Sequence, residues 1–386
     1  MYNMKDGEFM NLRRISVISV CTVFLAFFLK FCLAREYGAA YAYYVDIWAV
    51  YLNLAVVFFA VMISSYAMHI LGYLVAGLLS GYKPVSVELS RFVIRKTDGK
   101  FHLIYKKGKK GVYVRMSPPD YNDGKFPFVL YRLGAVIGFS VIAFVSGIVV
   151  IYLLCVGLNF SAFYVCCVFI LFAGQIVLYL MAASKGNSSV LTDIRRMKTD
   201  GYVRKAMWIL KKAYTDIHQG IRLSEQPEER FPDIDEKYLS DRIVSEILWL
   251  KMYRYLDTGD FENADKTADM LLSEKCGQCT DVKRFVALEK IFISLVLETS
   301  AESTETLLTP DIERFIKKRK DNINVKRVNY ALALLYCNDP EMASVTKTEL
   351  EKAISNLDSK ADIMTEKDLM KVVECRYIQM FGKIND

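Results

Sequence analysis

The chain has 386 residues and a formal net charge of +7, a length that allows one to three domains. Its mean hydropathy of +0.21 describes neither half, because nearly all long apolar runs lie before about residue 184 and a charged, helix-favouring half follows. Much of the positive charge lies between Lys83 and Lys125, directly between apolar runs. Lys and Arg in that position mark the cytoplasmic side of a membrane protein. We therefore expect membrane lipids, and no nucleic acid, as partners of this segment.

Four apolar runs predict transmembrane helices, near residues 15–34, 45–79, 128–154 and 160–183. The second exceeds the ~20 residues that cross the hydrocarbon, so it is either strongly tilted, or it crosses and then continues as a buried or interfacial turn through "HILGYLVAGLL". The third and fourth are joined by a short uncharged turn and form a hairpin. With the basic segments inside, both termini are cytoplasmic, which predicts a multi-pass protein of the plasma membrane.

Residues 84–117, between the second and third runs, alternate apolar and polar side chains around a turn at Asp98-Gly99. This pattern predicts a small β-hairpin sheet on the cytoplasmic face. His102 falls on one of its strands, where we expect an exposed side chain.

From Thr199 onward, apolar residues recur at the three- and four-residue spacing of amphipathic helices. The stretch "YRYLDTGDFENADKTADMLL" resembles one unit of a tetratricopeptide repeat, although no regular period of about 34 residues is visible. We expect an irregular helical-hairpin domain that contacts a cytosolic protein. Its basic run "ERFIKKRKDNINVKR", residues 313–327, is interpreted as a solvated helix face.

These patterns define the expected fold class. It is an α-helical membrane protein of about four transmembrane helices with a small cytosolic sheet, followed by a cytosolic all-α helical-hairpin domain. The membrane domain covers residues 1–184, with the β insert at about 84–117. A connecting helix and acidic linker follow over 185–232, and the cytosolic domain covers 233–386.

A histidine lies inside the second apolar run, in the stretch "HILGY". Ionisable side chains at such a depth mark functional sites by default. Helical zinc hydrolases use H-E-x-x-H, in which two histidines bind zinc and the glutamate acts as general base. Against that motif, His69 stands at the first histidine, Ile70 at the glutamate and Tyr73 at the second histidine.

The longer stretch "HILGYLVAGLLSGYKPVSVEL" resembles the H-E-L-G-H-L-x-x-G-L-x-x-G-Y segment of the site-2 protease family of bacterial intramembrane zinc metalloproteases. Gly72, Gly77, Gly81 and Tyr82 stand at matching places. The β-hairpin after the motif, "MSPPD" and "YRLGAVIG" agree with the family in arrangement. The resemblance covers residues 45 to about 231 and implies a protease-like core in the membrane domain.

The resemblance also implies a third zinc ligand, an aspartate in an N-D-G or L-D-G motif after a later membrane segment. Here the matching stretch is "GNSSVLTD", with Ser188 where the aspartate should stand. Asp193 and Asp200 are the nearby acids that could replace it. Ile70 cannot transfer protons, and the phenol of Tyr73 titrates near ~10 and is a poor ligand at neutral pH. A single histidine cannot hold tetrahedral zinc, so we expect no cofactor and no catalytic residue at this site.

Three functions fit these observations. The first is a non-catalytic pseudoprotease that binds a membrane segment or peptide in its intramembrane groove and recruits a cytosolic partner. The second is an active intramembrane zinc metalloprotease with displaced ligands. The third is a membrane-anchored scaffold in which the helical domain performs the function.

Overall fold

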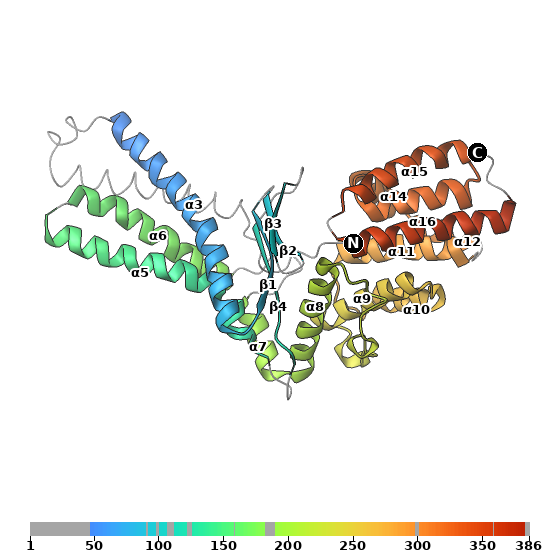
Figure 1. Cartoon of the computed structure of the whole chain (residues 1–386), viewed down its shortest axis with the longest axis horizontal. Coiled ribbons are helices and arrows are strands. Elements are labelled where there is room, and N and C mark those ends of the chain that lie inside the picture. The colour runs from blue at the N-terminus through green and yellow to red at the C-terminus, as the bar shows by residue number, and fades with distance from the viewer. Residues whose placement is uncertain are drawn as a thin grey trace. The chain divides into compact units, whose positions relative to one another are not determined.

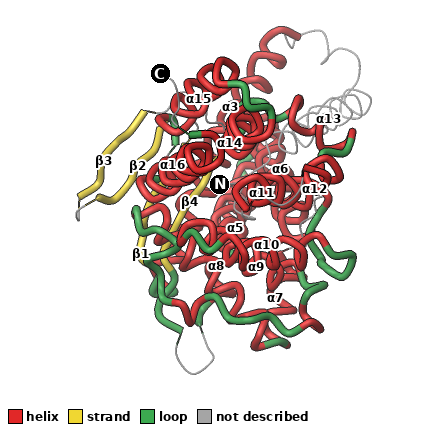
Figure 2. Tube along the Cα trace, turned by 90° about the vertical axis from the view of Figure 1, so that its right-hand side faces the viewer, coloured by secondary structure: helices red, strands yellow, loops and turns green. Residues whose placement is uncertain are grey.

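The computed structural model describes residues 47–386 except for short segments at 90–91, 98–99, 106–111, 122–125, 158, 182–189, 298–300, 358 and 383–386. The described chain is mostly helical and contains one four-stranded antiparallel sheet (Figures 1 and 2). It forms two compact units, one ending at Thr199 and the other beginning at Asp200. The first predicted membrane span, residues 15–34, lies outside the described residues.

The described residues of the first unit form five helices and four strands. The helices are α3 (Ile47–Leu79), α4 (Phe128–Arg132), α5 (Gly134–Cys155), α6 (Asn159–Met181) and α7 (Val190–Thr199), and the strands are β1 (Lys83–Leu89), β2 (Phe92–Thr97), β3 (Lys100–Tyr105) and β4 (Val112–Ser117). From Ile47 onward the second apolar run is a single helix of 33 residues, so the alternative of a turn through "HILGYLVAGLL" is wrong. At 1.5 Å per residue α3 is about 50 Å long, well beyond the ~30 Å hydrocarbon core.

Helices α3 and α5 approach so closely that their backbones are in contact. A Cβ atom added at Gly72 would lie 2.1 Å from the carbonyl oxygen of Gly134, and one at Gly138 would lie 2.2 Å from that of Met68. Only glycine fits at these positions. Small residues allow helices in an apolar environment to pack in this way. At the end of α3, Gly81 has a φ of +76°, the left-handed conformation that commonly terminates a helix.

Two helices of the described residues are long and apolar enough to cross a membrane, Ala55–Leu79 within α3 and Gly134–Cys155. Only 24% and 22% of their most apolar stretches are buried, so most of this apolar surface faces outward. Within α6 the described residues contain a shorter apolar stretch, Val165–Val177. Of the expected membrane-type helices, the described residues thus contain two full-length candidates and one shorter apolar stretch within α6.

The sheet has the strand order β3-β2-β1-β4, and every neighbouring pair is antiparallel. It runs from Lys83 to Ser117, which confirms the sheet predicted for residues 84–117. Val112 and Val114 of β4 are buried, whereas His102 on the outer strand β3 is exposed, as expected. The sheet is therefore covered at its β4 side and open at its β2–β3 side.

In the second unit, all regular structure within the described residues is helical. Its α-helices are α8 (Gly201–Gln219), α9 (Arg242–Thr258), α10 (Phe261–Leu272), α11 (Thr280–Leu297), α12 (Ala301–Leu307), α13 (Pro310–Lys318), α14 (Ile323–Ala331), α15 (Pro340–Ser355) and α16 (Lys360–Phe381), with short turns η1 (Glu228–Arg230), η2 (Glu236–Tyr238) and η3 (Leu332–Tyr336). Consecutive helices pack on one another from α8 to α12 and from α14 to α16, whereas α13 and α14 both pack on α11. Helix α16 returns to contact α8, α9 and α11. The stretch that resembles a tetratricopeptide unit is a helix–turn–helix of α9 and α10, turning at Gly259 with a φ of +78°.

Most of these helices begin at a side chain that caps their first free backbone N–H groups. Such caps fix where each helix starts, because the oxygen of Asp, Asn, Ser or Thr replaces the missing carbonyl acceptor. The capping residues are Asp200, Asp241, Asp260, Thr309, Asn322, Asp339 and Ser359.

Candidate functional site

His69 lies in the interior of the helices of the first unit, and its side chain is fully buried. The His69 ring contacts the Tyr73 ring edge-on, with the ring centroids 5.0 Å apart. It also contacts the ring of Tyr179 on α6 edge-on, with the centroids 6.2 Å apart. Phe139 of α5 lies 6.4 Å away. The hydroxyl groups of Tyr73 and Tyr179 are hydrogen-bonded to each other. His69 and Tyr73 are thus brought together by α3, as the motif requires, but aromatic rings surround the imidazole.

A second polar contact joins α3 to α6 one turn before the histidine. Gln175 Nε2 donates a hydrogen bond to Ser65 Oγ at 2.9 Å, and both side chains are buried. Buried polar groups within apolar helices need such partners, because water is not present to replace them. The interior of this unit therefore contains a small polar layer built from α3 and α6.

The acids expected as replacement ligands have other partners. Asp193 of α7 forms a buried ion pair with Arg132 of α4, with side chains 3% and 8% exposed. Asp200 caps α8, and its Oδ1 accepts hydrogen bonds from the backbone N–H groups of Tyr202 at 2.8 Å and Val203 at 3.3 Å. Ser188 lies outside the described residues.

Among the described residues, those around His69 do not supply the ligand set of a catalytic zinc site. Catalytic zinc takes three protein ligands, drawn from imidazole, thiolate and carboxylate groups. Within the part of the chain that the structure describes, no group of three such side chains is close enough to hold a metal ion. His69 is instead bordered by two phenols and a phenyl ring, and Ile70 stands at the position of the general base.

A different set of polar residues is buried in the second unit, around Arg327 of α14. Arg327 donates hydrogen bonds to Glu366 Oε1 of α16 at 2.6 Å and to Glu289 Oε2 of α11. Glu289 Oε1 accepts further hydrogen bonds from Tyr253 and Asn324, each at 2.7 Å. Arg327 and Glu289 are fully buried, and the guanidinium lies 5.0 Å from the Phe292 ring centroid.

This burial corrects one expectation from the sequence. Arg327 ends the basic run that we interpreted as a solvated face, yet it is the central cation of the core. A signal was present in the sequence. Glu289 falls on the apolar stripe of its helix, between Phe285 and Phe292. A charged residue at a core position indicates that a buried partner of opposite charge must be supplied by another element.

A neighbouring ionic cluster joins the segment after α8 to α9 and α16. Arg222 Nη2 donates a hydrogen bond to Asp257 at 2.7 Å, and its Nη1 donates to Asp368 at 2.7 Å. Burial of Asp257 would raise the pKa of its carboxyl group, but hydrogen bonds from Arg222, Ser224 and Thr365 outweigh burial and lower it. Asp257 is therefore held as a carboxylate at neutral pH.

No protein-family model matches the chain, and neither does any curated protein or solved structure. We therefore interpret both polar sites from the residues of this chain.

Proposed function

We propose that this protein is a non-catalytic membrane protein of the pseudoprotease kind, in which the first unit binds a membrane segment or peptide and the second recruits a cytosolic protein. The observation that carries this proposal is the surroundings of His69. Among the described residues, the aromatic neighbours of His69, Ile70 at the position of the general base and the pairing of Asp193 with Arg132 offer no ligand set for a hydrolytic metal. What remains is a close-packed helical core that retains the arrangement of the motif without its chemistry.

The outward-facing apolar surface supports a location in the membrane. A core helix of a soluble protein would be mostly buried, whereas α3 and α5 expose most of their apolar residues. Hydrocarbon is the solvent that such a surface suits. The basic segments of the sequence then favour a multi-pass arrangement in the plasma membrane with both termini in the cytoplasm.

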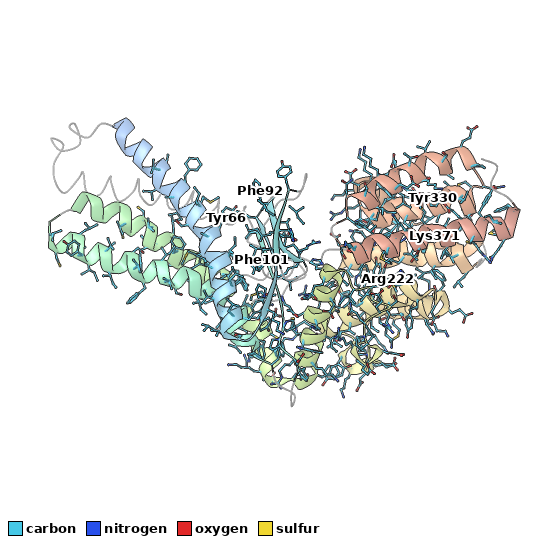
Figure 3. All side chains as sticks on the ribbon, in the orientation of Figure 1. Tyr66, Phe92, Phe101, Arg222, Tyr330 and Lys371 are labelled. Carbon is cyan, nitrogen blue, oxygen red and sulfur yellow. The ribbon has the colours of Figure 1, made fainter. Side chains whose placement is uncertain are left out.

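The open side of the sheet supports contact with the lipid surface. Phe92 pairs with Tyr105, and Ile94 pairs with Leu103. Directly paired residues share a face of the sheet, and all four are exposed. Figure 3 shows Phe92 and another exposed aromatic residue, Phe101, on these strands. Lysines flank this hairpin in the sequence, as expected for a segment beside anionic headgroups.

Metal analysis of the full-length protein, purified in detergent, tests the proposal. We expect substoichiometric zinc, no change in that content in His69→Ala, and no proteolysis after Ile70→Glu alone. The triple change Ile70→Glu, Tyr73→His and Ser188→Asp restores the ligand types of the motif and is the positive control for zinc uptake. Stoichiometric zinc in the unaltered protein, lost in His69→Ala, would establish the metalloprotease instead, with Asp193 or Asp200 as ligand.

A membrane-anchored scaffold is the second candidate. The observation in its favour is that the second unit has a complete core of its own, with buried residues on every helix from α8 to α11 and on α13 to α16. Replacing the first unit with an unrelated membrane anchor separates the two functions. A scaffold keeps its cytosolic partner and its cellular activity after this exchange, whereas a pseudoprotease keeps only the partner.

A further inference from the structure

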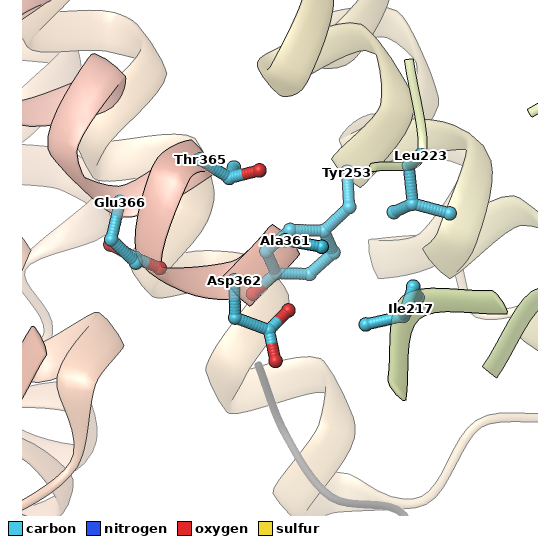
Figure 4. Close-up of a pocket in the computed structure, with 7 residues that line it drawn as sticks. All are labelled: Ile217, Leu223, Tyr253, Ala361, Asp362, Thr365 and Glu366. Atoms are coloured by element: carbon cyan, nitrogen blue, oxygen red, sulfur yellow. The ribbon is translucent and has the colours of Figure 1, made fainter. Parts of the chain in front are cut away.

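A small cavity of about 20 Å³ opens beside α16 in the helical unit, as Figure 4 shows. It is lined by Ile217, Leu223, Tyr253, Ala361, Asp362, Thr365 and Glu366. Asp362 and Glu366 lie four residues apart on one helix and therefore share a face. Asp362 and Thr365 are partly exposed, so the cavity communicates with solvent.

One carboxylate oxygen in this cavity has no hydrogen-bond partner. Glu366 is 3% exposed, and its Oε1 accepts a hydrogen bond from Arg327. Its Oε2 is buried and accepts none. Both oxygens of Glu289, in contrast, accept hydrogen bonds from protein donors. A buried carboxylate oxygen without a donor is costly, which indicates that a donor from outside the described structure completes it.

The charges around the cavity do not balance. Arg327 carries one positive charge, whereas its two partners, Glu289 and Glu366, carry two negative charges. Asp362 adds a further carboxyl group beside them, and it accepts no hydrogen bond from the described residues. Burial is the main cause that raises the pKa of Asp362, and the carboxylates of Glu366 and Asp257 raise it further, whereas the positive charge of the N-terminus lowers it. A cation at this place would relieve the excess of negative charge.

The size and lining of the cavity restrict which cation can enter. A volume of 20 Å³ exceeds the ~10–15 Å³ that one water-sized group needs, and it is too small for a cation with several carbon substituents. Ile217 and Leu223 form an apolar wall, which suits the methylene groups attached to an ammonium nitrogen. The ring of Tyr253 completes the lining, and aromatic rings attract such cations.

We propose that this cavity binds a primary ammonium group, which donates hydrogen bonds to Glu366 Oε2 and the Asp362 carboxylate. The group is carried either by a free small amine or by a lysine side chain of a protein that docks on the helical unit. This site is independent of the function proposed for the membrane unit.

The test measures binding to the full-length protein in detergent, in a phosphate buffer that contains no amine. Methylammonium chloride and, as the control, tetramethylammonium chloride are each titrated into the protein at equal ionic strength. Binding is measured by calorimetry, and the change in Tm is measured by thermal unfolding. We expect saturable binding and a rise in Tm with methylammonium only. Asp362→Asn should abolish both effects. Asp368→Asn, on the same helix and outside the cavity, should retain them.

A second binding experiment, with peptides, distinguishes the two sources of the ammonium group. The probe is acetyl-Gly-Lys-Gly-amide, with its Nε-acetylated form as the control. Binding at least tenfold tighter than methylammonium, lost on acetylation, supports a lysine of a docking protein. Binding of methylammonium without such a gain supports a free small amine. Equal responses to methylammonium and tetramethylammonium, or a response that survives Asp362→Asn, would overturn the proposal.

Discussion

The two units differ in how far their helices expose large apolar side chains. In α5, Phe144 and Ile151 are 71% and 64% exposed, while Ser146 on the same helix is buried. In α11, Phe285 and Phe292 are almost completely inaccessible. The first unit thus presents apolar side chains to its surroundings, and the second unit encloses them. In the proposed membrane location, each unit faces a different solvent, and the polar interactions inside each unit can be compared on that basis.

The buried polar interactions of the two units also differ in how many residues each one connects. Within the described part of the first unit, the interior contacts are short links between neighbouring elements, such as Gln175 with Ser65 and Arg132 with Asp193. The second unit contains a connected network in which Arg327 links three helices. Breaking the network should therefore cost more than breaking any contact in the first unit.

The largest effect is expected from Arg327→Met. It leaves Glu289 and Glu366 buried without their cation, and breaking a buried pair in this way costs about 3–5 kcal/mol of the free energy of unfolding. Denaturant unfolding of the full-length protein measures it. The control is Lys326→Met, whose ion pair with the exposed Glu349 should contribute less than about 1 kcal/mol. Similar losses in both variants would contradict a buried network.

Asp193→Asn tests the buried ion pair of the first unit. The amide leaves Arg132 with a weaker partner in a buried place, so we expect a loss of about 2–3 kcal/mol. Asp200→Asn is the matched control, because asparagine caps a helix about as well as aspartate. Thermal unfolding in detergent compares the two. Unchanged stability in Asp193→Asn would mean that its carboxylate serves another purpose, such as metal binding.

Gly138→Ala tests the close contact of α3 and α5. The added methyl group would lie 2.2 Å from the Met68 carbonyl oxygen, so the helices must separate, at a cost of about 1–3 kcal/mol. Gly147→Ala, on the same helix, would place its Cβ 3.6 Å from the Phe169 ring, an ordinary contact. It should be neutral or stabilising by up to about 1 kcal/mol, because alanine favours helix. The prediction fails if the two variants behave alike in detergent.

The smallest effect is expected from Asp362→Asn, measured without amines. Burial raises the pKa of Asp362 in the folded protein, so its ionised form destabilises the fold at pH above that pKa. The variant should have a higher Tm than the unaltered protein at neutral pH. The difference should shrink as the pH falls through the folded-state pKa and should vanish only well below ~4, where the carboxyl is protonated in both the folded and the unfolded state. A lower Tm at neutral pH would indicate that the carboxylate is already compensated.

Much of the fold could be predicted from local patterns. The alternation in residues 84–117 predicted the sheet, and the single apolar run predicted α3, because both patterns have the period of the backbone structure that they form. The exposed position of His102 followed in the same way. The solvated face assigned to the basic run was wrong for Arg327, since composition alone cannot tell a surface cation from a buried one.

The candidate site was predictable only as a set of positions. The sequence indicated that His69 and Tyr73 share a helix face and that Ile70 cannot act as a base. It did not indicate that Tyr179, 106 residues beyond Tyr73, lies against both rings. Nor did it indicate that Asp193 pairs with Arg132.

The sequence by itself determined where helices and strands form, because periodicity and capping act over a few residues. It also determined that His69 lacks the neighbouring glutamate and histidine of the zinc motif. Only the tertiary structure decided which charges are buried together, such as Arg327 with Glu289 and Glu366, and which oxygen is left without a donor. The physical reason is that burial and ion pairing depend on contacts between helices far apart in the chain, and no local pattern specifies those contacts.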